Sequence, residues 1–178
     1  LWGGSADLAD TAGGRLSASD TFLSPADTSG RPGSVGGRQV HYGVREHAMA
    51  AISNGIALGG WSRPFANGYL VFADYLRPSL RLAALMELPV LYSLTHDSIA
   101  VGEDGPTHQP VEHVSSLRLI PGLAVIRPAD ADEVLGALRR VVESPEGPAV
   151  IVSSRQAVPR LGLGETAVAG ARRGGYVV

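Results

Sequence analysis

Three short, continuous apolar runs mark the second half of the chain: residues 89–95, 123–126 and 149–152. Runs of this kind are typical of strands that are buried on both faces of a sheet. An amphipathic helix is expected between the last two runs, because Asp130 can cap its start, Glu133 completes a capping box and Pro145 ends it. Strands that alternate with helices through short loops predict an α/β fold in three layers, with a mostly parallel sheet and helices on both faces.

Two further helices are expected upstream of these runs. Residues 45–58 contain good helix formers with apolar residues at helical spacing, and Gly59-Gly60 supplies a stop. Residues 73–86 also place their apolar residues on one helical face, although Pro78 is unfavourable beyond the first turn of a helix.

The remaining segments are rich in glycine and small residues. Residues 10–37 predict a long irregular segment with at most one helical turn, near residues 17–22. Residues 161–178, rich in Gly and Ala, predict a linker followed by the start of a further, C-terminal domain. We therefore expect one domain over residues 1–160.

Composition narrows the classes of protein to which the chain can belong. The 178 residues are 44% hydrophobic, with a mean hydropathy of +0.10, which is ample for one packed core. A net charge of -2 without a dense basic cluster argues against a nucleic-acid partner. The sequence has no cysteine, no leader-like segment and no apolar run near the roughly 18 residues of a membrane helix. These features favour a soluble, cytoplasmic protein with no membrane partner.

The segment THDSIAVGEDGPTHQP, at residues 95–110, follows directly after an apolar run and fits neither a helical nor a strand period. A polar loop at the carboxyl end of a parallel strand is where such sheets bind ligands, so we expect a functional loop here. A metal centre is a weaker alternative, because eleven residues separate its two histidines and match no standard ligand spacing. Its ligands would be His96, Asp97, Asp104 and His108.

Single residues in these segments also have purely structural explanations. Glu46, in the first turn of a predicted helix, is a favourable partner for the positive end of the helix dipole. Asp104, before Gly105 and Pro106, is typical of a turn. Phe72 can belong to the core, and Arg155 can be a surface cation.

Taken together, five motifs resemble the transketolase family in their order and spacing. They are GGSADL (3–8), YGVREHAM (42–49), THDSIAVGEDGPTHQP (95–110), RPAD (127–130) and SRQ (154–156). The resemblance is to that family's middle domain and covers roughly residues 1–160. It implies thiamine diphosphate chemistry, in which a two-carbon ketol unit moves from a ketose phosphate to an aldose phosphate. This domain would bind the pyrimidine end of the cofactor, while an N-terminal domain, which this chain lacks, would hold the diphosphate and a Mg or Ca ion.

The resemblance also implies roles for residues on the cofactor side. Glu46 matches the catalytic acid whose carboxyl shares a proton with a ring nitrogen of the pyrimidine, within an apolar and desolvated site. Phe72 matches the aromatic residue that stacks on this ring. Asp7 lies where an acid supports the site between subunits. Tyr75, and with it Tyr69, would extend the pocket.

On the substrate side the resemblance implies five binding residues. His96 and His108 resemble the histidines that bind sugar hydroxyl or phosphate groups, and His108 would also assist proton transfer as a catalytic residue. Asp104 resembles the acid that accepts a hydrogen bond from the hydroxyl next to the aldehyde. Arg155 resembles a phosphate anchor, for which a guanidinium fork is well suited. Thr11 falls where a hydroxyl helps to hold that phosphate.

The resemblance further implies an active site between two subunits of a homodimer, completed by the N-terminal domain of the second subunit. The complete enzyme would act on sugar phosphates in the pentose phosphate pathway, and this chain alone would be inactive. Two alternatives remain. A relative of the dihydroxyacetone synthase type would tolerate the loss of Arg155, and a non-catalytic α/β assembly module would leave Glu46 as an ordinary exposed carboxylate.

Overall fold

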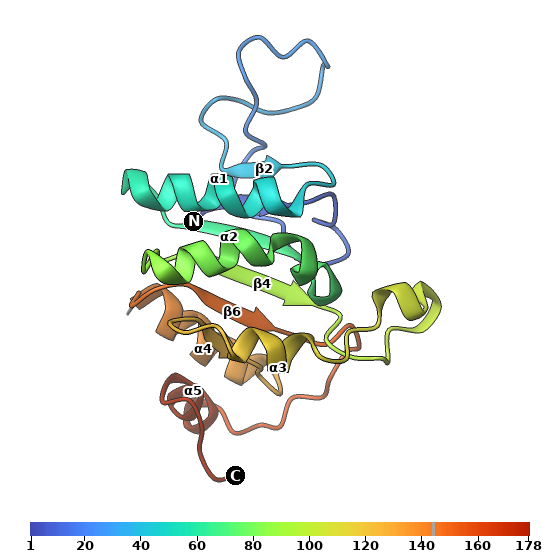
Figure 1. Ribbon diagram of the computed structural model, residues 1–178, viewed down its shortest axis with the longest axis vertical. Coiled ribbons are helices and arrows are strands. Elements are labelled where there is room, and N and C mark those ends of the chain that lie inside the picture. Colours follow the sequence, from blue (N-terminus) through green and yellow to red (C-terminus); the bar gives the residue numbers. More distant parts are fainter. Residues whose placement is uncertain (144) are drawn as a thin grey trace.

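The chain folds around a six-stranded sheet in which each strand runs parallel to its neighbours (Figure 1). The computed structural model describes residues 1–143 and 145–178. The strands are β1 (Trp2–Ser5), β2 (Gln39–His41), β3 (Pro64–Tyr69), β4 (Leu91–Thr95), β5 (Ala124–Ile126) and β6 (Ala149–Val152). Their order in the sheet is β2-β1-β3-β4-β6-β5. The predicted α/β class is confirmed.

Helices cover both faces of this sheet. They are α1 (Glu46–Gly59), α2 (Ala73–Leu85), α3 (His113–Arg118), α4 (Ala131–Glu143) and α5 (Glu165–Arg172). Helices α1, α2 and α3 lie on one face and α4 lies on the other, with α5 packed against α4 (Figure 1). The predicted three layers are therefore confirmed. Within the described part of the chain, no helix combines the length and apolar character needed to cross a bilayer.

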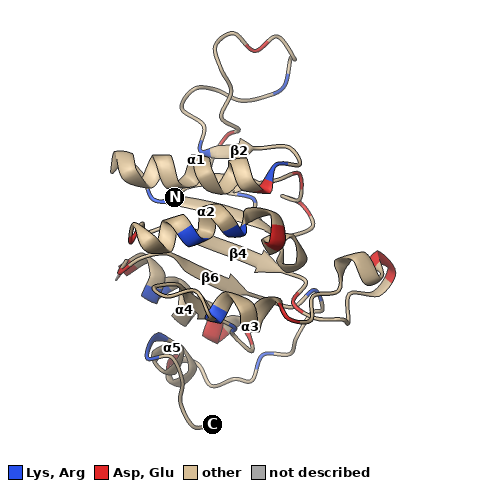
Figure 2. Cartoon of the chain, viewed as in Figure 1, with Lys and Arg blue, Asp and Glu red and all other residues tan. Residues whose placement is uncertain are grey.

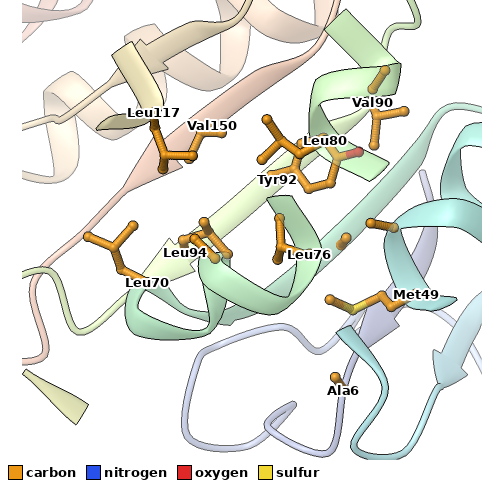
Figure 3. Close-up of a cluster of buried hydrophobic side chains, with 14 of the residues drawn as sticks. Ala6, Met49, Leu70, Leu76, Leu80, Val90, Tyr92, Leu94, Leu117 and Val150 are labelled. Carbon is orange, nitrogen blue, oxygen red and sulfur yellow. The ribbon is translucent and has the colours of Figure 1, made fainter. Parts of the chain in front are cut away.

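The pleat of β4 sends alternate side chains into two separate cores. Tyr92 and Leu94 point to the face covered by α1 and α2, where Leu80 of α2 packs over the sheet (Figure 3). Leu91 points to the other face, beside Ala149 of the neighbouring strand β6 and against α4. Because both faces are largely buried, the strand is mostly apolar, which is why it could be predicted.

Helix α4 begins at the cap that the sequence predicts. Asp130 Oδ1 accepts hydrogen bonds from the backbone N–H groups of Asp132 and Glu133, both at 3.1 Å. The Glu133 carboxylate accepts from the Ala129 backbone N–H at 2.6 Å, one residue before the cap. Side chains thus accept hydrogen bonds from backbone N–H groups both in the first turn of the helix and in the turn that precedes it.

Pro78 lies inside α2, which runs without interruption from Ala73 to Leu85. The expected difficulty is avoided because Pro78 is exposed and its missing N–H leaves only one carbonyl, that of Asp74, without its usual partner in the helix. A short 3₁₀ helix, Leu70–Phe72, leads directly into α2 and sets its direction.

At most one helical turn is expected near residues 17–22, and these residues form none. Thr21 and Phe22 instead make isolated parallel bridges, the first with Gln39 and the second with Ser34. These partners lie 12 or more positions further along the chain, so local propensity could not reveal them. The rest of residues 10–37 forms the irregular segment that was expected, and it extends beyond the β2 edge of the sheet (Figure 1).

Residues 161–178 contain helix α5, which the sequence did not predict. Ala167 and Val168 of this helix are buried. A Cβ atom on Gly136 of α4 would lie 2.5 Å from the Val168 carbonyl oxygen, so glycine is needed where the two helices meet. Small residues that resemble a flexible linker therefore serve close packing, and the segment is not an unstructured linker over residues 165–172. The domain boundary at residue 160 stays a prediction.

Asp132, near the start of α4, fastens the segment that joins β6 to α5. Its buried carboxylate accepts hydrogen bonds from Arg160 Nε at 2.9 Å and from the Gly164 backbone N–H at 3.1 Å. The hydrogen bond from Arg160 is the main reason that the pKa of Asp132 lies below its usual value of 3.8. A lowered pKa in the folded state stabilises the fold above that usual value, and this stabilisation is lost as the pH falls through the folded-state pKa.

We expect Asp132→Asn to lower the Tm of the chain most near neutral pH, because asparagine cannot supply the charge that Arg160 engages. The Tm difference from the native sequence should shrink as the pH is lowered from about 6 to about 3. Thermal unfolding followed by circular dichroism across this range measures the difference. Asp20→Asn, at an exposed position, is the control and should change Tm little at any pH. A difference for Asp132→Asn that does not vary with pH would contradict the expectation.

Candidate functional site

A hollow of about 490 Å³ opens at the carboxyl edge of the sheet, a volume typical of small-molecule sites, which span roughly 300–1,000 Å³. Loops that follow parallel strands meet at this edge, so segments far apart in the sequence converge there. The lining residues are Ala6, Asp7, Leu8, Val44, Glu46, Phe72, Tyr75 and His108. Acidic segments gather at the same edge (Figure 2). The hollow thus contains Asp7, Glu46, Phe72 and Tyr75 from the predicted cofactor side, but not Tyr69, and His108 from the predicted substrate side.

Glu46 is the first residue of α1 and brings a carboxylate to the wall of the hollow. The chain enters the helix through Arg45, whose guanidinium donates a hydrogen bond to the Tyr42 carbonyl at 3.0 Å. The positive end of the helix dipole favours a carboxylate at this position. Glu46 is nevertheless only 9% exposed. Its burial disfavours the alternative in which it is an ordinary exposed surface acid.

Aromatic and histidine rings form a continuous wall between the hollow and the loop that follows β4. The rings of Tyr69 and Phe72 are nearly parallel, at 8°, with centroids 6.0 Å apart. Phe72 also lies 5.3 Å from the His108 ring and 6.1 Å from the Tyr75 ring. On its other side Tyr69 stacks on His96, with centroids 3.6 Å apart. Tyr69 therefore joins the cofactor side of the predicted site to its substrate side.

His96, Asp104 and Arg155 meet beyond Tyr69. Asp104 Oδ2 lies 3.9 Å from His96 Nε2 and 3.5 Å from Arg155 Nε. This oxygen is buried and accepts no hydrogen bond from any described residue, so it can accept one from a ligand hydroxyl. Arg155 Nη2 lies 2.7 Å from Glu103 Oε1, but Glu103 is largely exposed, so this ion pair contributes little and the guanidinium can exchange its partner.

His96 has an unusual backbone and a lowered pKa. Its φ of 60° lies in the left-handed region, which residues with a Cβ rarely adopt. Burial lowers the pKa of the His96 imidazole below its ordinary value, against the opposing effect of the Asp104 carboxylate. Its Nδ1 is 2.9 Å from the Thr95 hydroxyl oxygen. A neutral ring held on one nitrogen leaves Nε2 for a ligand on the Asp104 side.

Thr11 lies apart from this arrangement. It is exposed on the loop after β1 and does not line the hollow. Arg155 follows β6, and strands β3 and β4 separate β6 from β1 in the sheet. The two residues that the resemblance assigns to one phosphate stand on loops that follow strands not adjacent in the sheet, and the role of Thr11 stays a prediction. Asp7, in contrast, lines the hollow on a left-handed backbone with φ of 68°.

Four residues of the site were not expected from the sequence: Ala6, Leu8, Val44 and Glu103. Leu8 and Val44 supply apolar walls to the hollow, and Glu103 pairs with Arg155. Leu8 and Val44 each stand one or two positions from a motif acid, and an apolar residue beside a functional acid in a loop is the signal that could have found them. No local signal could pair Glu103 with Arg155, because 52 positions separate them.

A separate group of acidic and histidine side chains lies outside the hollow. Asp74 Oδ2 is 3.2 Å from His113 Nε2, and Glu112 Oε2 is 3.8 Å from His113 Nδ1. The pair of Asp74 and His113 links α2 to α3, which explains the arrangement without an ion. Among the described residues, His96, Asp97, Asp104 and His108 do not gather three or more ligand atoms close enough together to hold a metal ion.

Comparison with known proteins decides the family. The family model for the transketolase pyrimidine binding domain matches residues 1–160. The chain belongs to the transketolase family. The resemblance drawn from the five motifs is thereby confirmed.

Transketolases of known sequence are similar along the whole chain. That of Geobacillus stearothermophilus is 52% identical over 100% of this chain and 26% of its own length. That of Cereibacter sphaeroides is 54% identical over 88% of this chain and 23% of its own length. The chain therefore spans about a quarter of the transketolases it matches.

Solved transketolase structures share the fold. The Pichia stipitis enzyme in complex with sedoheptulose-7-phosphate superposes with a TM-score of 0.89 at 41% identity, over 98% of this chain and 25% of its own. The Leishmania mexicana transketolase superposes with a TM-score of 0.84 at 43% identity, over 96% of this chain and 25% of its own. A split gene transketolase, described as an inactive tetramer of four β subunits, superposes with a TM-score of 0.60 at 28% identity, over 70% of this chain and 39% of its own.

Proposed function

We propose that the chain is the pyrimidine-binding part of a complete transketolase, which moves a two-carbon ketol unit from a ketose phosphate to an aldose phosphate. The buried Glu46 carboxylate, which lines the same hollow as Phe72, carries this proposal. An acid of this kind beside a flat aromatic ring suits a heteroaromatic ligand whose ring nitrogens exchange protons. The transketolases that match along the chain support the same activity.

The hollow fits the pyrimidine end of thiamine diphosphate. Its walls are apolar at Leu8, Val44 and Phe72, and Glu46 is the buried acid among them. Of the described residues that line it, none is arginine or lysine. A diphosphate would therefore need groups from elsewhere, and we propose that a second domain supplies them together with a magnesium ion.

Thiamine diphosphate, when bound, supplies the carbon centre that accepts and releases the ketol unit. Glu46 would hold a proton on its carboxyl against a ring nitrogen, and Phe72 would fix the plane of the ring. The apolar wall would exclude water from both groups. His108 Nδ1 lies 2.8 Å from the Thr107 hydroxyl oxygen, so its Nε2 would be the atom that moves a proton to or from a sugar hydroxyl.

On the substrate side, each group has a distinct task. Asp104 Oδ2 would accept a hydrogen bond from the hydroxyl next to the aldehyde, since no described residue donates a hydrogen bond to this oxygen. His96 Nε2 would bind a sugar hydroxyl in its neutral form. Arg155 would exchange Glu103 for the substrate phosphate, because a phosphate offers the guanidinium stronger charged hydrogen bonds than an exposed carboxylate does.

The rim of the hollow supports an active site shared between subunits. Val44 is 74% exposed and Tyr75 is 64% exposed, so apolar side chains surround the opening. Another protein surface would cover them, and we propose the N-terminal domain of a second subunit in a cytoplasmic homodimer of the pentose phosphate pathway. On this proposal the chain alone is inactive, which agrees with the description of the split gene relative as an inactive tetramer.

Arg155→Gln in the complete enzyme tests both the activity and the phosphate role. We expect the KM for sedoheptulose 7-phosphate to rise about tenfold to a hundredfold, the equivalent of one charged hydrogen-bonded contact. The KM for unphosphorylated sedoheptulose should stay within about threefold, because only the phosphate contact is lost. Steady-state kinetics with both donors, with thiamine diphosphate and magnesium present, measure the difference.

Arg139→Gln is a matched control, because Arg139 also pairs with an exposed glutamate but lies on α4. It should leave both KM values unchanged. Equal increases for the two donors after Arg155→Gln would reject the phosphate role. A complete native enzyme that transfers no ketol unit would reject the proposed function itself.

A further inference from the structure

Arg127, the first residue of the RPAD motif, reaches from the end of β5 to the loop after β4. Its Nε and Nη2 both lie 2.7 Å from Asp97 Oδ2. The Asp97 side chain is only 5% exposed, whereas that of Arg127 is 53% exposed. A buried carboxylate needs a charged or hydrogen-bonding partner, and this arginine supplies two donors. Strand β6 separates β4 from β5, so the contact spans the sheet edge on which the site is built.

Asp97 directly follows His96, whose left-handed backbone needs support from its surroundings. A φ of 60° at a residue with a Cβ persists only where the neighbouring structure fixes it. One support is visible in the ring of His96, which stacks on Tyr69 with centroids 3.6 Å apart. Another is the next residue, Asp97, because its buried carboxylate is anchored to a different loop. The imidazole is therefore aimed by contacts on both sides.

We propose that Arg127 is a positioning residue for His96, acting through Asp97. The inference rests on the proposed function, in which His96 binds a hydroxyl or phosphate of the sugar substrate. Arg127 does not touch the substrate. It holds the Asp97 carboxylate, and through it the backbone that directs His96 Nε2 toward Asp104.

Kinetics of Arg127→Gln in the complete enzyme test the proposal, with sedoheptulose 7-phosphate as the donor. We expect KM to rise about tenfold, within the hundredfold that a misplacement of roughly 1 Å can cost. The dissociation constant of thiamine diphosphate should not change, because Arg127 does not line the hollow. The KM of Arg127→Lys should rise less than that of Arg127→Gln, since lysine keeps the positive charge but lacks the paired donors of the guanidinium.

A double-mutant cycle separates positioning from general stabilisation. In an enzyme that already carries His96→Ala, adding Arg127→Gln should raise KM no further, because the aimed side chain is absent. Arg172→Gln is the matched control: this exposed arginine lies 2.9 Å from Glu143, on α5 and away from the site. It should leave KM unchanged. An equal KM increase from Arg127→Gln with and without His96 would overturn the proposal, as would no increase in either background.

Two further measurements remain decisive if Arg127→Gln weakens folding or if activity is absent. The double variant Arg127→Gln with Asp97→Asn removes the buried charge together with its partner, so it should recover Tm but keep the raised KM. In a crystal structure of that variant, His96 should leave its left-handed backbone and its stack on Tyr69. Retention of both features would overturn the proposal. A native enzyme without ketol transfer would reject the proposed function, whereas this geometry would still decide whether Arg127 holds His96.

Discussion

Glu46→Gln in the complete enzyme is expected to lower kcat by roughly a thousandfold, within the range of about 10² to 10⁴ that a positioned acid or base contributes. Glutamine keeps the size of the side chain and its place at the start of α1, but it cannot hold or release a proton. The folded state should survive, because removing one negative charge from the first turn of a helix typically costs only about 0.3–1 kcal/mol. Ketol transfer from a ketose phosphate to an aldose phosphate measures the effect.

The matched control is Glu165→Gln. Glu165 is also the first residue of a helix, α5, but its side chain is 81% exposed and lies away from the hollow. Glu165→Gln should leave kcat within about twofold of the native value, because surface substitutions usually have small effects. Circular dichroism and thermal unfolding of both variants would show that neither change unfolds the protein. A kcat for Glu46→Gln within tenfold of the native value would reject the proposed role of this acid.

Leu80→Ala is expected to lower the free energy of unfolding of the chain by about 3 kcal/mol, within the range of roughly 2–5 kcal/mol for a buried leucine. Leu80 is fully buried in α2, in the core that Tyr92 and Leu94 of β4 share (Figure 3). The substitution removes three side-chain carbons and leaves a cavity that tightly packed neighbours cannot fill. Because Tyr75 also lies on α2, a loosened helix would disturb the wall of the hollow as well.

Leu82→Ala is the internal comparison, because it makes the same chemical change two residues away on the same helix. Leu82 is 46% exposed, so its substitution should cost well under 1 kcal/mol, or about 0.5 kcal/mol. Urea unfolding of both variants, followed by circular dichroism and analysed with a common slope, gives the two values. Equal losses of stability would contradict the assignment of Leu80 to the core.

The elements of the fold that could be predicted are those whose signal is local. The strand that contains Tyr92 and Leu94 is a mostly apolar run, and the start of α4 has its own cap at Asp130. Both signals lie within a few residues, so neither requires knowledge of the rest of the chain. Helix α5 gave no such signal, because the small residues that let it approach Gly136 are also typical of flexible linkers.

The residues of the site also differ in how far the sequence could place them. The resemblance named Glu46, Phe72 and His108, and the structure brings these three residues to one hollow. The resemblance also named Thr11, which lies on the loop after β1 but outside the hollow. Sequence order alone cannot distinguish these outcomes, since the distance between two loops depends on the order of their strands in the sheet.

The sequence by itself determined the family, the alternation of strands and helices and the kinds of side chain at the site, because these depend on residue types and short spacings. Only the tertiary structure decided which of those side chains meet. Tyr69 joins Phe72 to His96, and Arg127 reaches Asp97 across β6. Such contacts connect residues far apart in the chain. They depend on the register and order of the parallel strands, and no local pattern of residues encodes that order.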